Sequence, residues 1–210
     1  MRKTDSGWAE AEHHISKADR KLAKVIAAVG PCTLKPDRKR SPYEALCRAV
    51  AHQQVHGKAA EAVLARLLAQ FPDHSFPPPE LIHKAKAETL RACGFSGAKV
   101  LALQDIAAKT LDGVIPDRRR CARLANEEII TRLTQARGVG RWTVEMFLMF
   151  TLGRPDVLPV DDFGIREGYR LLHKQEEQPK PKVLAEIGQK WAPWRTVASW
   201  YLWRAVDLYR

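Results

Sequence analysis

Two features of the sequence could do chemistry: a Gly138-Val139-Gly140 turn between two helix-forming stretches, and a pair of carboxylates, Asp161 and Asp162, farther along the chain. Two glycines allow a tight chain reversal and close approach to the backbone, and the amides that open the following helix attract an anion. A phosphate group fits such a site. A Gly-x-Gly sequence also occurs in ordinary helix connections, so the flanking residues must decide between the two interpretations.

Phosphate contacts carry no sequence information, so a protein that binds DNA through such a turn needs a pocket for specificity. Enzymes that act on a base extrude it from the duplex and hold it by stacking and edge contacts. Aromatic walls for a pocket are available, because four of the six tryptophans crowd the C-terminal end: Trp191, Trp194, Trp200 and Trp203. Core packing is the ordinary interpretation of any one of them, and a base-stacking wall is the alternative for a tryptophan that faces Asp162.

The elements that position these residues are predicted to be helices. Gly/Pro breaks separate segments with helical apolar spacing, and no two-residue hairpin loop joins alternating strands. Helix starts or preceding turns are indicated at Ser16–Asp19, Ser41–Glu44, Gly94–Gly97 and Asn126–Glu128. The fold class is therefore all-α.

Three details of these helices can be checked. Ser41 as N-cap with Pro42 at the first position predicts a helix that carries Leu46, Val50 and Val55 on one side. Asp161-Asp162, after an extended connector at 157–160, supply the N-cap of a helix over 163–172. The chain closes with helices over 182–191 and 194–209.

Composition narrows the class of protein. The chain has 210 residues, 45% of them hydrophobic, which is enough for one domain or two small lobes with a real core. Its 35 Lys+Arg against 24 Asp+Glu give a net charge of +11, which favours a polyanionic partner, although a merely solvated basic surface is the alternative. The basic clusters at Lys35–Arg40 and Arg118–Arg123 are interpreted as solvated loops rather than phosphate contacts.

The cysteines and the N-terminus exclude other classes. Cys32, Cys47, Cys93 and Cys121 are widely spaced, so neither a zinc knot nor an iron–sulfur cluster is indicated, and we expect reduced, buried thiols. The first residues form no apolar signal segment, and no apolar run approaches membrane-spanning length. We therefore expect an intracellular monomer without a secretion signal or membrane contact, cytoplasmic and nucleoid-associated if bacterial.

Three segments carry a resemblance to a known family. Leu133–Phe147, Leu158–Phe163 and Trp194–Trp203 resemble the helix-hairpin-helix Gly/Pro-Asp (HhH-GPD) superfamily of DNA glycosylases, in its 3-methyladenine DNA glycosylase II branch, and Arg48–Ala60 resembles the DNA-wedge region of that branch. The similarity runs from about Pro42 onward. It implies a single catalytic unit over 1–210 with its active site in a cleft between two helical lobes. One lobe is residues 42–152, with the helix-hairpin-helix at about 133–147, and the other joins 1–41 to 153–210.

The resemblance makes Asp162 the catalytic carboxylate and Asp161 a cap or pocket residue. Family members that also cut the strand carry a lysine after the Gly-Val-Gly-Arg segment, whose amine forms a Schiff base with the sugar. Trp142 stands there in this chain. The resemblance therefore implies a monofunctional glycosylase without lyase activity, with Trp142 and Trp203 lining the base pocket. Met146 and Glu145 are further pocket candidates, and Glu145 could equally face solvent.

The same comparison assigns the DNA contacts. The hairpin contacts are Arg137, Gly138, Val139, Gly140, Arg141 and Thr143, joined by Lys58. Candidates for the wedge that fills the gap left by the flipped nucleotide are Gln53, Gln54 and His56. The backbone carbonyls of Thr134, Ala136 and Val139 match positions that hold Na⁺ or K⁺ in relatives. No other cofactor is expected, and His52 with His56 lacks a third zinc ligand.

The implied activity is excision of alkylated purines, such as 3-methyladenine and 7-methylguanine, from double-stranded DNA by base flipping and hydrolysis, as the first step of base excision repair. Two alternatives remain at this point. One is a glycosylase for mismatched, deaminated or oxidised bases. The other is a non-catalytic helix-hairpin-helix module that only binds DNA, which would need neither Asp162 nor the tryptophans.

Overall fold

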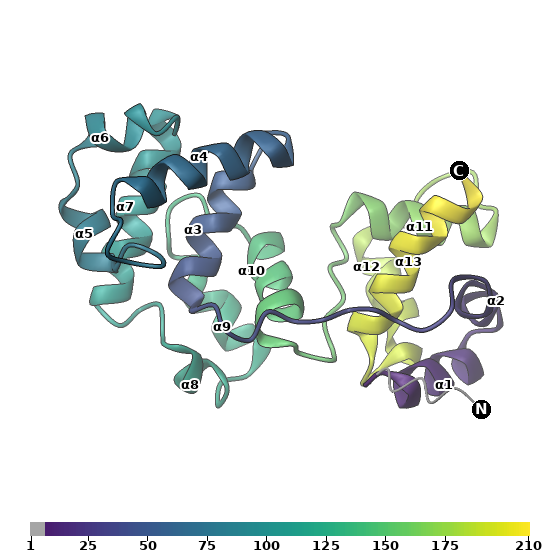
Figure 1. Cartoon of the computed structure of the whole chain (residues 1–210). Coiled ribbons are helices and arrows are strands. Elements are labelled where there is room, and N and C mark those ends of the chain that lie inside the picture. The colour runs from purple at the N-terminus through teal and green to yellow at the C-terminus, as the bar shows by residue number, and fades with distance from the viewer. Residues whose placement is uncertain (1–6) are drawn as a thin grey trace, which may run out of the picture. The chain divides into compact units, whose positions relative to one another are not determined.

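The structure is a computed structural model that describes residues 7–210, and helices joined by loops, with no strand, make up that part of the chain (Figure 1). The all-α prediction is confirmed. The chain forms two compact units. Asp37–Phe147 is called the hairpin unit here, and the described residues up to Pro36 together with Leu148–Arg210 are called the carboxylate unit. The N-terminal residues on which the absence of a signal segment was argued, 1–6, lie outside the described part.

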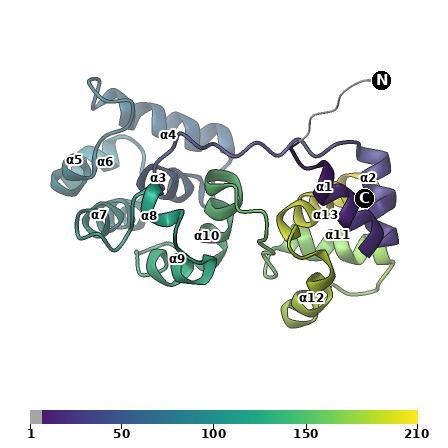
Figure 2. The same ribbon diagram turned by 90° about the horizontal axis from the view of Figure 1, so that it is seen from below.

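The hairpin unit is arranged around one long helix, α7 (Gly97–Leu111), which packs against α3, α5 and α6 (Figure 1, Figure 2). Buried Leu103 and Ile106 of α7 and Leu46 and Val50 of α3 form part of its core. The other helices are α3 (Pro42–His52), α4 (Gly57–Ala69), α5 (Pro79–Lys84), α6 (Ala87–Ala92), α8 (Arg118–Cys121), α9 (Asn126–Leu133) and α10 (Arg141–Phe147).

The carboxylate unit is built on the packing of α11 (Phe163–His173) against α13 (Arg195–Tyr209). The remaining helices are α1 (Ala9–Ala18), α2 (Arg20–Val29), the π-helical turn η1 (Leu148–Leu152), α12 (Pro181–Ile187) and the 3-10 turn η2 (Gly188–Trp191). Gly168 allows the closest approach, because a Cβ on this residue would collide with the backbone oxygen of Leu202 on α13. Trp191 is fully buried in this core and donates its indole N–H to Asp19.

Side-chain caps begin six of the thirteen α-helices in the described part of the chain. Ser41 caps α3 as predicted, since its Oγ accepts from the amide of Glu44 at 3.1 Å. Ser96 caps α7 in the same way, accepting from Lys99 N at 3.4 Å. The four cysteines are free and buried, as expected. No helix within residues 7–210 combines the length and the apolar character needed to cross a bilayer.

Three sequence predictions about helix boundaries are wrong. Ser16 lies inside α1, and the cap of α2 is Asp19, whose carboxylate accepts from two amides of its first turn. Helix α3 ends at His52, so Val55 does not extend its apolar side and is instead exposed. Asn126 is the first residue of α9 rather than its cap. Helix boundaries are where sequence patterns discriminate least.

Candidate functional site

The carboxylate of Asp162 is fixed by two donors at the start of α11. Its Oδ1 accepts from the backbone amide of Ile165 at 2.8 Å and from the indole Nε1 of Trp203 at 2.9 Å. The first bond is an N-cap, which joins the carboxylate to the positive end of the helix dipole. The second comes from α13, the helix packed against α11. The expectation that Asp161 is a cap is wrong, because Asp161 is exposed and the cap of α11 is Asp162.

Trp203 is held in place from two sides. Its ring stacks on Phe150, with centroids 5.9 Å apart and an interplanar angle of 26°. Its edge approaches Gly164 so closely that a Cβ there would lie 2.8 Å from Trp203 Cδ1. The glycine thus lets the indole reach Asp162. Neither Phe150 nor Gly164 was singled out from the sequence, because both act through contacts between segments far apart in the chain.

The other C-terminal tryptophans follow the ordinary interpretation. Trp191 and Trp200 are buried in the core of the carboxylate unit. Trp194 is half-buried and meets Trp8 edge to face at 6.5 Å. Among these four residues, only Trp203 has a described hydrogen bond to the carboxylate of Asp162. This selects it from the cluster as the one beside the proposed catalytic group.

The two glycines of the hairpin have different functions. Gly138 has φ +75°, a conformation that L side chains rarely adopt, and a Cβ there would lie 3.2 Å from Ala102 Cβ. Gly140 has ordinary φ, and a Cβ would meet nothing within 4 Å. Helix α10 begins at the next residue, and its first described bond runs from Val144 N to Gly140 O at 3.2 Å. Gly138 therefore makes the turn, and Gly140 leaves the helix start open to an approaching group.

The predicted hairpin contacts differ in what they can offer. Val139 and Thr143 have buried side chains, so a contact with DNA would have to use their backbone. Arg137 and Lys58 are exposed, and the backbone N–H of Arg137 donates to Asp105 at 2.7 Å. The carbonyl of Ala136 accepts from Val139 N at 3.1 Å within the turn. Backbone carbonyl oxygens are suitable ligands for Na⁺ or K⁺. The cation site at the carbonyls of Thr134, Ala136 and Val139 stays a prediction.

Arg141 is held by two carboxylates. It makes a bidentate pair with Glu127, at 2.9 and 2.5 Å, and its Nε donates to Glu145 at 3.0 Å. Hydrogen bonding to Arg141 lowers the pKa of Glu127, and the same pairing raises the pKa of Arg141. Glu145 is only 4% exposed. The sequence left open whether Glu145 faces the base pocket or the solvent. In the structure it does not face solvent, because it is a buried partner of Arg141, one helical turn away.

Trp142 presents the aromatic surface of the hairpin unit. Its side chain is 48% exposed although it is a large apolar group. Met146 lies one turn later on α10 and is half-buried. An exposed indole next to a glycine turn fits contact with a ligand better than packing.

The wedge candidates lie in a loop with unusual backbone. Gln54 has φ +55°, and His56 caps α4 by accepting from Lys58 N at 3.3 Å. The side chain of Gln53 donates to the carbonyl of Gly138 at 2.8 Å, which ties this loop to the hairpin. Gln54 is exposed.

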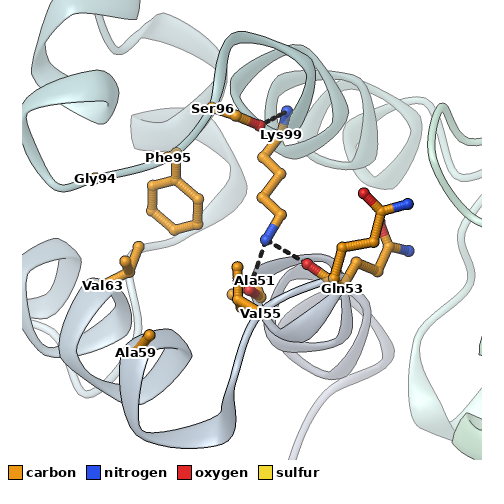
Figure 3. Close-up of a pocket in the computed structure, with 10 residues that line it drawn as sticks. Ala51, Gln53, Val55, Ala59, Val63, Gly94, Phe95, Ser96 and Lys99 are labelled. Carbon is orange, nitrogen blue, oxygen red and sulfur yellow. Dashed lines mark hydrogen bonds between the residues drawn. The ribbon is translucent and has the colours of Figure 1, made fainter.

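A pocket of about 360 Å³ lies beneath this loop, and Lys99 reaches into it from α7 (Figure 3). The ammonium donates to Ala51 O at 2.9 Å and to Gln53 O at 2.8 Å. Burial lowers the pKa of Lys99. No sequence signal pointed to Lys99, because a lysine near a helix start is usually a solvent-exposed residue.

The basic clusters are not simply solvated. Arg118 donates to the carbonyls of Asp37 and Arg40 at 3.1 and 3.2 Å, so one member of the second cluster holds the loop of the first. The interpretation of both clusters as solvated loops was therefore incomplete. The remaining side chains of Arg38, Lys39, Arg119, Arg120 and Arg123 are exposed.

The glycine hairpin of the hairpin unit and the helix-capping Asp162 of the carboxylate unit both lie within a part of the chain that matches a class of helix-hairpin-helix DNA-repair proteins. Residues 47–193 match the family described as HhH-GPD superfamily base excision DNA repair protein, and the chain belongs to this family.

Named relatives agree with this class. The chain is 45% identical over 202 residues to DNA-3-methyladenine glycosylase 1 of Schizosaccharomyces pombe, covering 95% of this chain and 88% of the relative. It is 34% identical over 207 residues to an alkylbase DNA glycosidase-like protein of the same yeast, covering 98% and 97%. The solved structure of the 3-methyladenine DNA glycosylase of S. pombe in complex with abasic DNA is similar with a TM-score of 0.81, at 45% identity, over 93% of this chain and 96% of that one.

Proposed function

We propose that this chain is a monofunctional DNA glycosylase that excises alkylated purines, such as 3-methyladenine and 7-methylguanine, from double-stranded DNA. Family membership and the names of two relatives support the reaction and the substrate class. The observation that carries the proposal is the carboxylate of Asp162, which Ile165 N and Trp203 Nε1 hold in one orientation.

This carboxylate suits hydrolysis of an N-glycosidic bond. As the bond between C1′ and the base nitrogen breaks, the base leaves with the electron pair and positive charge develops on the deoxyribose. A fixed carboxylate stabilises that charge and orients the water that adds to C1′, whose proton passes to solvent. An alkylated purine already carries positive charge and leaves as a neutral base, so one carboxylate is enough and no acid needs to protonate the leaving group.

Absence of strand cleavage follows from the residue after Arg141. A Schiff-base mechanism needs a lysine amine, and Trp142 occupies the position at which strand-cutting family members have one. The exposed indole offers a flipped, cationic base a surface on which to stack, worth about 0.5 to 2 kcal/mol. We expect a preference for positively charged purines for this reason.

The hairpin would bind the DNA backbone. Gly140 leaves the start of α10 open, where the helix dipole favours a phosphate. The carbonyl oxygens of the turn would hold a monovalent cation that stiffens the hairpin, and the hydrolysis itself needs no cofactor. A genomic substrate would place the protein in the compartment that holds the DNA, which is the cytoplasm in a bacterium.

The test compares wild type with Asp162→Asn on methylated duplex DNA, with release of free base as the measurement. Asparagine still caps a helix, so folding and duplex binding should be retained, while release should fall by about 100- to 1,000-fold because the negative charge is lost. Asp161→Asn is the matched control, with the same charge change one residue away, and should release base at nearly the wild-type rate. Equal release by wild type and Asp162→Asn would contradict the catalytic role. Strand breaks that appear without heat or alkali would contradict the monofunctional assignment.

A further inference from the structure

Helix α7 contacts both loops that are proposed to touch DNA. Lys99, Ala102 and Asp105 recur every three residues, so they form a slanted stripe along one side of the helix. Lys99 bonds the end of α3, from which the loop Gln53–His56 starts. Ala102 and Asp105 contact the hairpin at Gly138 and Arg137.

The contact at Lys99 has the chemistry of a built-in helix cap. The carbonyls at a helix C-terminus lack intrahelical partners and carry the negative end of the dipole, which favours a cation. The ammonium of Lys99 satisfies two of them, on Ala51 and Gln53. Figure 3 shows its side chain crossing the pocket from α7 to reach them. These two hydrogen bonds from a half-buried lysine connect the loop to α7.

The contact at the hairpin is equally direct. The carboxylate of Asp105 accepts from Arg137 N at 2.7 Å, and Ala102 packs where a side chain on Gly138 would lie. Gln53 connects the loop directly to the hairpin, since its side-chain amide donates to Gly138 O at 2.8 Å. Loop, hairpin and α7 are thus linked pairwise by hydrogen bonds, and Ala102 leaves little room for a side chain on Gly138.

We propose that Lys99 and Asp105 are positioning residues that fix the spacing between the loop Gln53–His56 and the hairpin, so that the duplex gap and the backbone phosphate are engaged at the same time. This inference rests on the proposed function, because it takes both loops to contact DNA. It assigns α7, which has no contact with DNA in the proposal, a function in damage recognition.

The first test measures discrimination rather than activity. Dissociation constants are determined for a duplex that contains a tetrahydrofuran abasic analogue and for the same duplex with all bases present. Only the first lacks a base and so leaves a gap in the base stack that the loop can fill. We call this first duplex, whose backbone is continuous, the gapped duplex. Lys99→Met should lower the preference for the gapped duplex by about tenfold, because two charge-assisted hydrogen bonds that order the loop are lost. Lys99→Arg keeps the charge and the donors and should restore most of the preference.

Lys84→Met is the matched control, since it removes an exposed lysine from the same unit and changes net charge equally. It should weaken binding to both duplexes alike and leave the preference unchanged. A preference that survives in Lys99→Met would overturn the positioning role. Equal weakening of both duplexes by Lys99→Met, beyond that in Lys84→Met, would reduce Lys99 to a residue that only stabilises the fold, and would also overturn it.

The second test asks whether the two contacts act together. Asp105→Ala should also lower the preference, and Asp105→Asn should restore it, because the amide oxygen can still accept from Arg137 N. Combined with Lys99→Met, Asp105→Ala should cost less than the product of the two separate effects, as expected for residues that maintain one spacing. Losses that multiply would mean two independent loops and overturn the inference. None of these measurements requires bond cleavage, so a wild type that prefers the gapped duplex but releases no base would count against the proposed function alone.

Discussion

Two helix starts, one in each unit, use the same backbone chemistry in opposite ways. Helix α11 begins after Asp162, whose carboxylate accepts from Ile165 N. Helix α10 begins after Gly140, which has no side chain with which to cap. The first helix brings its own anion, and the second offers its positive end to an anion from outside. In the proposed function, the residue that precedes each helix therefore decides its use: the capped start of α11 would support catalysis, and the uncapped start of α10 would bind a phosphate.

The two starts also differ in how firmly the helix behind them is packed. Gly168 lets α11 touch the backbone of α13 at Leu202, and that packing sets the distance from Asp162 to Trp203. At Gly140, by contrast, a Cβ would have no neighbour within 4 Å. The position of the Asp162 carboxylate thus depends on core packing, whereas the proposed phosphate site at α10 depends on open space around Gly140.

Gly168→Ala should have the largest effect on this comparison. Its Cβ would collide with a backbone oxygen that cannot rotate away, so we expect a loss of about 3 kcal/mol in the free energy of unfolding. Denaturant titration measures it. Gly140→Ala is the matched control, since its methyl group meets nothing, and its midpoint should stay close to that of wild type. Similar midpoints for the two variants would show that α11 and α13 can separate at little cost.

Gly140→Asp should convert the second helix start into a copy of the first. Because the added side chain has room, the fold should be retained, while the carboxylate takes the place of a phosphate and repels the duplex. We expect binding to undamaged duplex to weaken on the order of tenfold. Fluorescence anisotropy at fixed salt provides the measurement, and Gly140→Asn separates charge from bulk. If the aspartate and asparagine variants bind alike, the start of α10 is not an anion site.

What the sequence could predict was chemistry encoded within a few residues. The cap at Ser41, the break at Gly94–Gly97, the glycine turn and a cap within the pair Asp161-Asp162 all depend on neighbours in the chain, and the structure confirms them. The sequence also favoured Asp162 over Asp161, although only through the family resemblance. The catalytic role itself stays a prediction.

The partners of these residues could not be predicted in the same way. Glu127 of α9 pairs with Arg141 of α10, and Phe150 of η1 stacks on Trp203 of α13, and no local sequence pattern specifies how these helices pack. Lysine is usually a surface residue, but Lys99 donates a hydrogen bond to the carbonyl of Ala51, which is 48 residues away in the chain. Such contacts arise from packing between elements, so they became visible only when the helices were placed.

The ion pairs behind the two helix starts differ in how they should respond to acid. On α11, hydrogen bonds from Arg170 and Gln178 lower the pKa of Glu167 to about 2, and the residue is 9% exposed. On the side of α10, Arg141 lowers the pKa of Glu127, whose side chain is 71% exposed and therefore well solvated. Solvent screening makes such exposed pairs nearly neutral for stability, so the buried pair on α11 should matter more.

Glu167→Gln should have the smallest effect of the three. Since the folded pKa lies below the ordinary value of 4.5, the charged form stabilises the fold fully above that pH, and the contribution is lost as the pH falls toward 2. We expect the variant to be less stable than wild type by about 1 kcal/mol at pH 7, after discounting for the partly exposed arginine, and to lose stability less steeply below pH 4.5. Urea titrations between pH 7 and pH 3 measure both, with exposed Glu177→Gln as the control of equal charge. If the free energies of unfolding of wild type and Glu167→Gln change in parallel over this pH range, the pKa of Glu167 is the same in the folded and unfolded protein. The ion pair on α11 would then contribute no more to the pH dependence of stability than an exposed pair does.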